Sequence, residues 1–392
     1  KNTKGLTEVS MCYTGDILDV KRTKYNLDYY LQLAKDIENA GAHILAIKDM
    51  AGLLKPYAAT ELITALKETI NLPIHLHTHD TSALQIATYL KAVEAGVDVV
   101  DVAIGGLSGL TAQPNFNSML EFMQFHEREN KMDIAKLNKF SNYWEVVREY
   151  YYPFESGLKA GTAEVFKHEI PGGQYSNLIP QMTALGLADR FEDVKDTYAD
   201  VNQLFGDIVK VTPSSKVVGD MALYLVTNNL KASDVLDKGD TISWPESVQA
   251  FFRGDLGQPQ GGFPPELQKI ILKDKKPYSS LPNAHLESVD FDNEFITFNE
   301  KFKNNVTRKL NITDFISYKL YPKVYEDYSE KIRIYENISK IPTLNFFYGL
   351  KENEEVFVEI AKGKTIIVKL LSVGPANEEG FRTLFFSVNG QA

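Results

Sequence analysis

Short apolar runs alternate with amphipathic stretches over the first 105 residues of the chain. Each run spans seven or eight residues and is followed by a loop with glycine or proline, and then by apolar residues at helical spacing. The runs begin 26 to 35 residues apart, which is the length of one strand–helix unit. They are Glu8–Thr14, His43–Asp49, Pro73–Asp80 and Val99–Gly105. Near-continuous apolar runs alternating with helices predict a parallel sheet that is buried on both faces.

Three amphipathic stretches between these runs predict the helices of the same units. They are Leu27–Ala40, Ala58–Thr69 and Ser82–Ala95, and Gly41 and Gly96 follow the first and third as stop signals. A closed (β/α)₈ barrel needs eight units, and four are visible. The pattern therefore predicts the second half of a (β/α)₈ TIM barrel over residues 1–136, with the chain beginning in the middle of the barrel.

The pattern changes twice after the predicted half-barrel. Residues 137–322 lose the strand-like runs and predict a helical extension with loops rich in proline and glycine. Residues 323–392 contain three runs of strand-type residues, Val356–Ile360, Lys364–Val373 and Arg382–Asn389, separated by turn residues. The fold class is therefore α/β, with a helical extension and a small C-terminal α+β module that contains an antiparallel sheet.

Composition narrows the classes of function. The chain has 42 Lys and Arg against 52 Asp and Glu, a net charge of −10. No basic excess is available to neutralise phosphates or to attract an anionic membrane surface, so neither nucleic acid nor a membrane is expected as a partner. The single cysteine, Cys12, excludes an internal disulfide framework and fits a reducing compartment.

The sequence His75-Leu-His77-Thr-His79 is the sharpest local signal for chemistry. Alternate residues of a strand share a face, so the three imidazoles point the same way. His77 and His79 lie nearest the carboxyl end of the strand, where a barrel has its catalytic mouth, and we predict that they bind one metal ion. His75 lies deeper, and a hydrogen-bonded structural role is favoured for it.

Lys48 ends the second apolar run and faces the same side as Ile44 and Ala46. Its ammonium group would repel a metal ion unless it were neutralised or converted to an anion by carboxylation with carbon dioxide. On chemistry alone, an ion pair with Asp49 or Asp80 is the favoured alternative.

The segment Lys210-Val-Thr-Pro-Ser-Ser-Lys216 lies between two predicted helices. Thr212 precedes proline and is expected to be extended, and Ser214 or Ser215 could cap the helix that follows. A capping loop is the favoured interpretation from the residues alone. The alternative is a loop whose hydroxyl groups and ammonium group hold an anionic or amide-like ligand.

Four motifs in series resemble one family. They are KDMAGLLKP at 48–56, HLHTHDT at 75–81, EIPGGQY at 169–175 and KVTPSSKVVGD at 210–220. Together they are similar to the carboxyltransferase domain of the biotin-dependent pyruvate carboxylases. The tail FRTLFFSVNGQ at 381–391 is similar to the end of the allosteric and tetramerisation domain of that family.

The resemblance implies a role for each motif. It makes His77, His79 and a carboxylated Lys48 the ligands of zinc or manganese, which replaces the ion pair favoured for Lys48. It makes Thr212 the hydroxyl that moves a proton between the pyruvate methyl group and biotin. It also implies that Ser215, Lys216 and Gln174 line the biotin pocket.

The implied reaction is transfer of CO₂ from carboxybiotin to pyruvate, which gives oxaloacetate. In the full enzyme of this family, a biotin carboxylase domain that is not in this chain uses ATP, Mg²⁺ and bicarbonate, acetyl-CoA is an effector, and the enzyme is a homotetramer. The family's metal-binding aspartate and pyruvate-binding arginine belong to the first half of the barrel and are not in this sequence. We therefore expect this chain to be a C-terminal piece of a larger polypeptide and to be inactive alone.

Two alternatives stay open from the sequence. One is a carboxyltransferase subunit of the oxaloacetate decarboxylase or transcarboxylase type, and the other is a non-catalytic fragment for assembly and regulation. The expected location is the cytoplasm for a bacterial source and the mitochondrial matrix for a eukaryotic one.

Overall fold

The chain divides into two compact units, Lys1–His285 and Leu286–Ala392. The computed structural model describes residues 4–155, 157–280, 282–306 and 308–392. This division into compact units does not test the domain boundaries predicted after residues 136 and 322. Those boundaries stay predictions.

Four parallel strands in chain order form the sheet of the first unit. They are β1 (Glu8–Cys12), β2 (Ile44–Asp49), β3 (Ile74–Thr78) and β4 (Val99–Val100). Lys48 of β2 pairs with Cys12 on one side and with His77 on the other. The predicted parallel sheet is confirmed, but the prediction of a strand over Val99–Gly105 is wrong in length. After Val100 the backbone makes one more bond to β3, from Asp101 to Leu76, and then turns toward Pro114, so the ladder ends.

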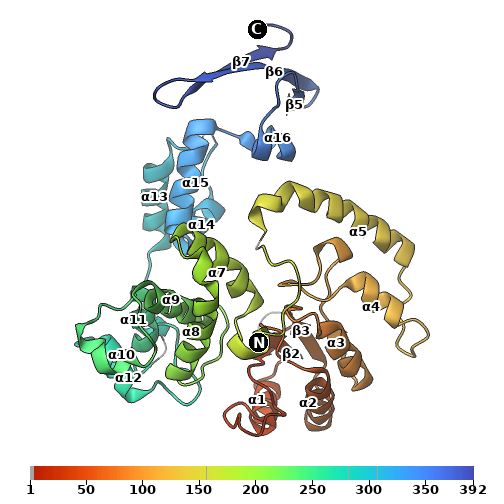
Figure 1. The fold of residues 1–392 in the computed structure, drawn as a ribbon, viewed down its shortest axis with the longest axis vertical. Helices are drawn as coiled ribbons and strands as arrows, with labels where there is room; N and C mark the ends of the chain where they lie inside the picture. Colours follow the sequence, from red (N-terminus) through yellow and green to blue (C-terminus); the bar gives the residue numbers. More distant parts are fainter. Residues whose placement is uncertain (1–3, 156, 281, 307) are drawn as a thin grey trace. The chain divides into compact units, whose positions relative to one another are not determined.

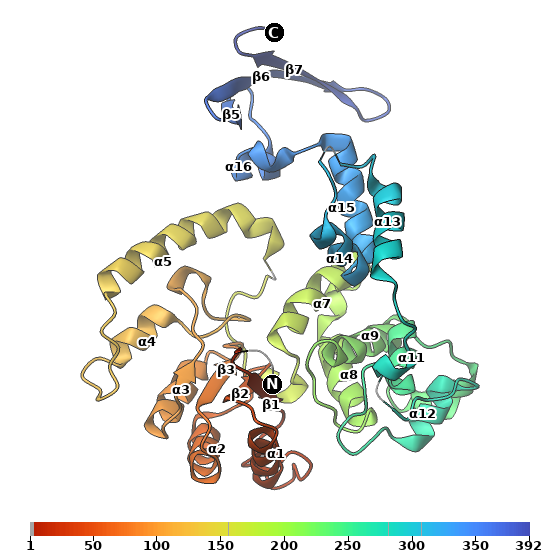
Figure 2. The ribbon, with the colours of Figure 1, turned by 180° about the vertical axis from the view of Figure 1, so that it is seen from behind.

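Three helices lie side by side along one face of this sheet (Figures 1 and 2). They are α1 (Leu27–Asn39), α2 (Pro56–Thr69) and α3 (Gln85–Glu94), close to the predicted ranges. Asn26 caps α1 by accepting a hydrogen bond from the Tyr29 amide, and Pro56 occupies the first turn of α2. These signals explain why the helices begin where they do.

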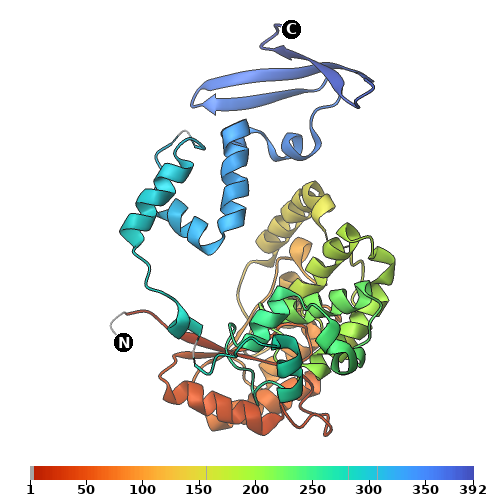
Figure 3. The ribbon, with the colours of Figure 1, turned by 90° about the vertical axis from the view of Figure 1, so that its left-hand side faces the viewer.

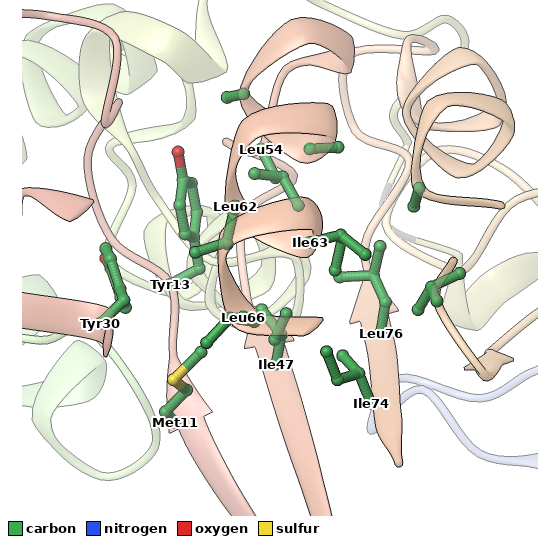
Figure 4. Packing of buried hydrophobic residues seen from close by; sticks show 14 of the residues in the cluster. Met11, Tyr13, Tyr30, Ile47, Leu54, Leu62, Ile63, Leu66, Ile74 and Leu76 are labelled. Atoms are coloured by element: carbon green, nitrogen blue, oxygen red, sulfur yellow. The ribbon is translucent and has the colours of Figure 1, made fainter. Parts of the chain in front are cut away.

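The apolar face of α2 covers the sheet (Figure 4). Leu62, Ile63 and Leu66 point toward side chains of the strands below, and all three are fully buried. Ile47, Ile74 and Leu76 supply the strand side of this core. Because the buried side chains of β3 are Ile74, Leu76 and Thr78, His75 and His77 face the other side of the sheet.

The rest of the first unit is helical, as predicted. Its helices are α4 (Phe116–Phe122), α5 (Ile134–Arg148), α6 (Val165–His168), α7 (Gly172–Ala184), α8 (Phe191–Leu204), α9 (Ser214–Thr227), α10 (Asp234–Lys238), α11 (Glu246–Arg253) and α12 (Pro265–Leu272). Helices α7 to α12 surround a second hydrophobic core that includes Leu178, Tyr198, Phe205 and Met221. The apolar pattern predicts helices over Ser141–Tyr151, Asn177–Leu185, Phe191–Leu204, Lys216–Asn228, Ser247–Arg253 and Pro265–Leu272, which overlap α5, α7, α8, α9, α11 and α12. It missed α4, α6 and α10, which have seven residues or fewer, too few turns for a repeated apolar pattern.

In its described residues, the second unit combines α-helices with an antiparallel sheet (Figure 3). The helices are α13 (Phe291–Phe302), α14 (Ile312–Leu320), α15 (Pro322–Tyr335) and α16 (Thr343–Tyr348), and the sheet contains β5 (Glu355–Ala361), β6 (Lys364–Ala376) and β7 (Arg382–Val388). The predicted antiparallel pairing is confirmed. In the described part of the chain, no helix has both the length and the apolar character needed to cross a membrane.

Candidate metal centre and carboxyl-transfer site

Two histidines face each other at the carboxyl end of β3. The Nε2 atoms of His77 and His79 lie 3.4 Å apart, and the two rings are nearly perpendicular, at 82°. The strand alternation explains this arrangement, because residues 75, 77 and 79 share the face opposite the helices.

The other nitrogen of each ring is already engaged. His77 Nδ1 lies 2.7 Å from Asp101 Oδ2, and His79 Nδ1 donates to the carbonyl oxygen of Thr111 at 2.6 Å. The pKa of Asp101 is held below its ordinary value, first by the hydrogen bond from His77, so this carboxylate is ionised and accepts. Both Nδ1 atoms therefore carry the hydrogen, which leaves a free lone pair on each of the two neighbouring Nε2 atoms.

This donor set fits a divalent metal ion. Two nitrogens bound tetrahedrally at about 2.0–2.1 Å are about 3.4 Å apart, which matches the separation of the two Nε2 atoms. A carboxylate or carbonyl behind each ligating imidazole is the usual arrangement at such sites. Burial, and then the charges of His77 and Lys48, lowers the pKa of His79, which favours the neutral ring that a metal requires.

Lys48 lies directly beside His77 in the register of β2 and β3 and projects from the same face. The ion pair with Asp49 or Asp80 that its chemistry alone favoured is not formed. Asp49 is fully buried and accepts hydrogen bonds from the Leu53 and Leu54 amides, and Asp80 accepts one from Gln85. Among the described residues, Lys48 Nζ has no hydrogen-bond or ion-pair partner, and its charge acts on His79 and Cys12.

A third protein ligand of the usual type is not close to the two imidazoles. Within the ranges that the structure describes, no group of three or more His, Cys, Asp or Glu side chains could hold a metal ion. The site thus consists of two imidazoles and the amine of Lys48, which can ligate only after deprotonation or carboxylation.

Sequence reasoning missed Asp101 and Thr111, which orient the two imidazoles. A signal for Asp101 was present, because it is the charged residue within the fourth apolar run, two residues after Val99, the partner of His75. Its Oδ1 atom also contacts His75 Nε2 at 2.9 Å, while His75 Nδ1 lies 3.0 Å from Glu8. The hydrogen-bonded role favoured for His75 is confirmed. Thr111 acts through its backbone carbonyl, which leaves no mark in the sequence.

The start of α7 lies close to the His79 ring. The Gly172 amide donates to the carbonyl oxygen of Met50, just beyond the end of β2. A Cβ atom on Gly172 would lie 2.9 Å from His79 Nδ1 and 3.1 Å from the Thr111 carbonyl oxygen. Glycine is therefore needed here to let the backbone approach the ring.

Substitution of Gly172 by alanine should weaken metal binding by about 10–100-fold, the range measured when the groups that orient a ligand are lost. The added methyl group would displace His79 from the Thr111 carbonyl. Gly173→Ala is the matched control, because a Cβ atom there meets nothing within 4 Å. Equal metal affinities for the two variants, measured by competition with a chelator, would contradict this explanation.

The loop that carries Thr212 runs from Lys210 to the start of α9. Thr212 is exposed, Ser215 is buried, and Lys216 Nζ contacts Asp220 at 2.5 Å. The expected cap by Ser214 or Ser215 is wrong. Both serines lie inside α9, and Ser214 Oγ instead donates to the Val209 and Val211 carbonyls and accepts from the Val211 amide, which closes the preceding turn.

Gln174 connects α7 to this loop region. Its side chain is buried, and its Nε2 atom would lie 2.6 Å from a Cβ atom on Gly219, one turn beyond Ser215 in α9. The structure thus brings Lys48, His77 and His79 together at the sheet edge, and it packs Gln174 of α7 against Gly219 of α9, the helix that also contains Ser215.

Comparison with known proteins assigns the chain to a family. Residues 165–369 match the family described as conserved carboxylase domain, and residues 16–143 match the HMGL-like family. The first match alone covers more than half of the chain. The chain belongs to the conserved carboxylase family. It corresponds to the carboxyltransferase region of pyruvate carboxylases.

Individual relatives agree with this assignment. The chain is 51% identical over 391 residues to the pyruvate carboxylase of Bacillus subtilis and 50% identical over 388 residues to that of Staphylococcus aureus. It covers 34% and 33% of those proteins, so it spans about a third of the length of these relatives. The carboxyl transferase domain of Rhizobium etli pyruvate carboxylase, solved with pyruvate and biocytin, is 49% identical, with a TM-score of 0.91 over 98% of this chain and 64% of that one.

A buried histidine outside the candidate site, His168, should make the stability of this region depend on pH. His168 ends α6, and burial lowers its pKa to about 4. Its Nδ1 atom accepts from the Ile170 amide, and in the described structure its buried Nε2 atom has no hydrogen-bond partner. Protonation would therefore place a charge where water cannot reach it.

We expect stability to fall as the pH drops from about 6.5 to about 4, because the unfolded chain binds a proton in this range and the folded chain does not. The shift of His168 corresponds to a loss of about 3 kcal/mol. His168→Asn, whose Oδ1 atom can still accept from Ile170, should show a flatter curve in urea unfolding at each pH. His75 and the carboxylates titrate in both proteins, so parallel curves for the two would contradict the assignment to His168.

Proposed function

We propose that this chain is the carboxyltransferase part of a pyruvate carboxylase and that it serves to transfer the carboxyl group of carboxybiotin to pyruvate, giving oxaloacetate. The observation that carries the proposal is the 3.4 Å separation of the Nε2 atoms of His77 and His79, next to Lys48 on the neighbouring strand, in a chain with the relatives described above. The likeness to a structure that contains pyruvate and biocytin supports the choice of substrates.

We assign His77, His79 and a carboxylated Lys48 as the residues that hold a zinc or manganese ion. Carboxylation would turn Lys48 from a repelling cation into an anionic oxygen donor, and its lack of a protein partner leaves the amine available for this. When bound, such an ion would supply Lewis-acid chemistry beside these residues.

Thr212 is the proposed catalytic residue. Its hydroxyl would accept the proton that leaves the methyl group of pyruvate and donate a proton to the ureido nitrogen of biotin, so one group performs both transfers. Its exposure in a turn that Ser214 fixes on both sides suits a group that must meet a substrate. Ser215, Lys216 and Gln174 are proposed to line the biotin pocket.

The remaining parts of the proposal concern the whole enzyme. ATP, Mg²⁺ and bicarbonate would be used by a separate biotin carboxylase domain, acetyl-CoA would be the effector, and the assembly would be a homotetramer. We place the enzyme in the bacterial cytoplasm, or in the mitochondrial matrix of a eukaryote.

Transfer of a carboxyl group from supplied carboxybiotin to pyruvate by the full-length polypeptide tests the proposal. Oxaloacetate should form, and ATP with bicarbonate should support the same product through the enzyme's own biotin. Formation of oxaloacetate from carboxybiotin but never from ATP would favour a subunit of the decarboxylase or transcarboxylase type. No product under either condition would favour a fragment for assembly and regulation.

A further inference from the structure

We propose that Glu169 is a positioning residue for the proposed transfer reaction, and that with Lys210 and Arg22 it fixes the Thr212 loop to the end of β1. The inference rests on the function proposed above for Thr212. We call these three side chains the clasp.

The first contact of the clasp is a buried ion pair. Lys210 is only 1% exposed, and its Nζ atom lies 2.9 Å from Glu169 Oε2. The same ammonium group donates to Thr14 Oγ1 at 3.3 Å, and Thr14 lies two residues after the end of β1. Lys210 thus links Thr14, at the sheet edge, to Glu169. Lys210 itself stands two positions before Thr212 in the sequence.

A second cation holds Glu169 from the other side. Arg22 lies in the loop after β1, and one of its terminal nitrogens is 3.1 Å from Glu169 Oε1 and 3.7 Å from Asp207. Burial alone would raise the pKa of Glu169, but the charges of Lys210 and Arg22 outweigh it and hold the pKa below its ordinary value. The carboxylate is therefore ionised and is the anion that two cations share.

The geometry transmits the position of Lys210 to Thr212. The turn between them is closed by Ser214, which donates to the Val209 and Val211 carbonyls at 2.6 Å. The Ser215 amide then donates to the Val211 carbonyl at 3.2 Å. Because both flanks of Thr212 are fixed in this way, a shift of Lys210 moves the whole turn instead of being absorbed within it.

The clasp joins two motifs that otherwise have separate roles. Glu169 opens the motif that contains Gln174, and Lys210 opens the motif that contains Thr212. Glu169 itself adopts a left-handed conformation, with φ of 54°, at the end of α6, which aims its side chain back toward Lys210. Catalysis is sensitive to such placement, because a displacement of about 1 Å can cost about 100-fold in rate.

A structural ion pair elsewhere provides a matched control. Lys195 is also buried, at 5% exposed. It pairs with Glu164, which directly precedes α6, and with Glu192 on α8. Among the described residues it makes no hydrogen bond or ion pair with the 210–216 segment. Lys195→Met should therefore lower stability without moving Thr212.

The test uses Glu169→Gln in the full-length enzyme, with hydrogen exchange of the Val211, Ser215 and Lys216 amides as the first readout. We expect exchange to quicken by at least about 10-fold, and kcat for oxaloacetate formation to fall by about 100-fold with KM for pyruvate within about twofold. Lys195→Met should change neither quantity. If Glu169→Gln folds poorly, the double variant Glu169→Gln with Lys210→Met removes the uncompensated charge, and it should fold yet remain slow.

Each outcome decides one claim. Unchanged exchange in the 211–216 amides would overturn the clasp. Faster exchange with normal kcat, in an enzyme that Thr212→Ala inactivates, would overturn the positioning role. Normal turnover in Thr212→Ala would instead overturn the proposed role of Thr212, while the exchange measurement would still report on the clasp.

Discussion

Replacement of Thr212 by alanine is expected to abolish oxaloacetate formation in the full-length enzyme while leaving bicarbonate-dependent ATP cleavage intact. The methyl side chain cannot accept or donate a proton, and a group that acts as general acid and base contributes roughly 10²–10⁴-fold to a rate. Thr212→Ser keeps the hydroxyl and should retain part of the activity. Thr212 is exposed and its hydroxyl makes no structural bond in the described protein, so the variant should fold normally.

Thr183→Ala is the control for Thr212. Thr183 lies on α7 and its hydroxyl donates only to the Ile179 carbonyl of the same helix, at 2.9 Å. Its loss should leave both half-reactions unchanged. Near-normal carboxylation by Thr212→Ala, measured as pyruvate-dependent oxaloacetate production, would show that the proton moves by another route.

Loss of either imidazole is expected to weaken binding of the divalent ion by more than about 100-fold. Removal of the groups that only orient a ligand costs 10–100-fold, so loss of the ligand itself should cost more. His77→Asn and His79→Asn can be compared by metal content after dialysis and by competition with a chelator. Both should also lose pyruvate carboxylation while retaining ATP cleavage.

His43→Asn serves as the control for these variants. His43 lies at the opposite end of β2 and its Nδ1 atom accepts from the Thr7 amide, far along the strand from Lys48. It should keep its metal and its activity. A stoichiometric metal in His77→Asn or His79→Asn would remove that imidazole from the proposed ligand set.

The periodic parts of the chain could be predicted from the sequence. The strands that end at Asp49 and Thr78, and helices α8 and α12, have regular apolar patterns, and the structure places them within a few residues of the expected ranges. The fourth strand was overestimated, because an apolar run continues through Val102 while the hydrogen-bonded ladder does not. The apolar pattern of a segment predicts which residues are buried, whereas the length of a strand depends on hydrogen bonds to a neighbouring strand.

The position of the candidate site could be predicted where it depends on side chains of one strand. It could not be predicted where it depends on a backbone group, such as the Thr111 carbonyl, or on pairs of distant residues. The three histidines share one face because of strand alternation. For Lys48, the residues alone favoured an ion pair with Asp49 or Asp80, which the structure does not form, and its role as a ligand is implied only by the family resemblance and stays a prediction. The pairing of Glu169 with Lys210, and of Asp101 with His77, joins residues from distant parts of the sequence, so periodicity contains no record of it. Ser214 illustrates the ambiguity of local rules, because a serine at the start of a helix can close the preceding turn instead of capping the helix.

Anomalous diffraction from crystals of the full-length enzyme tests the metal centre most directly. We expect one peak at the absorption edge of zinc or manganese, within about 2.0–2.2 Å of His77 Nε2 and His79 Nε2, with planar density for a carboxyl group on Lys48 Nζ. Rings that point apart with no anomalous peak between them, or an unmodified Lys48 that lies away from the ion, would contradict the ligand set on which the proposed function rests.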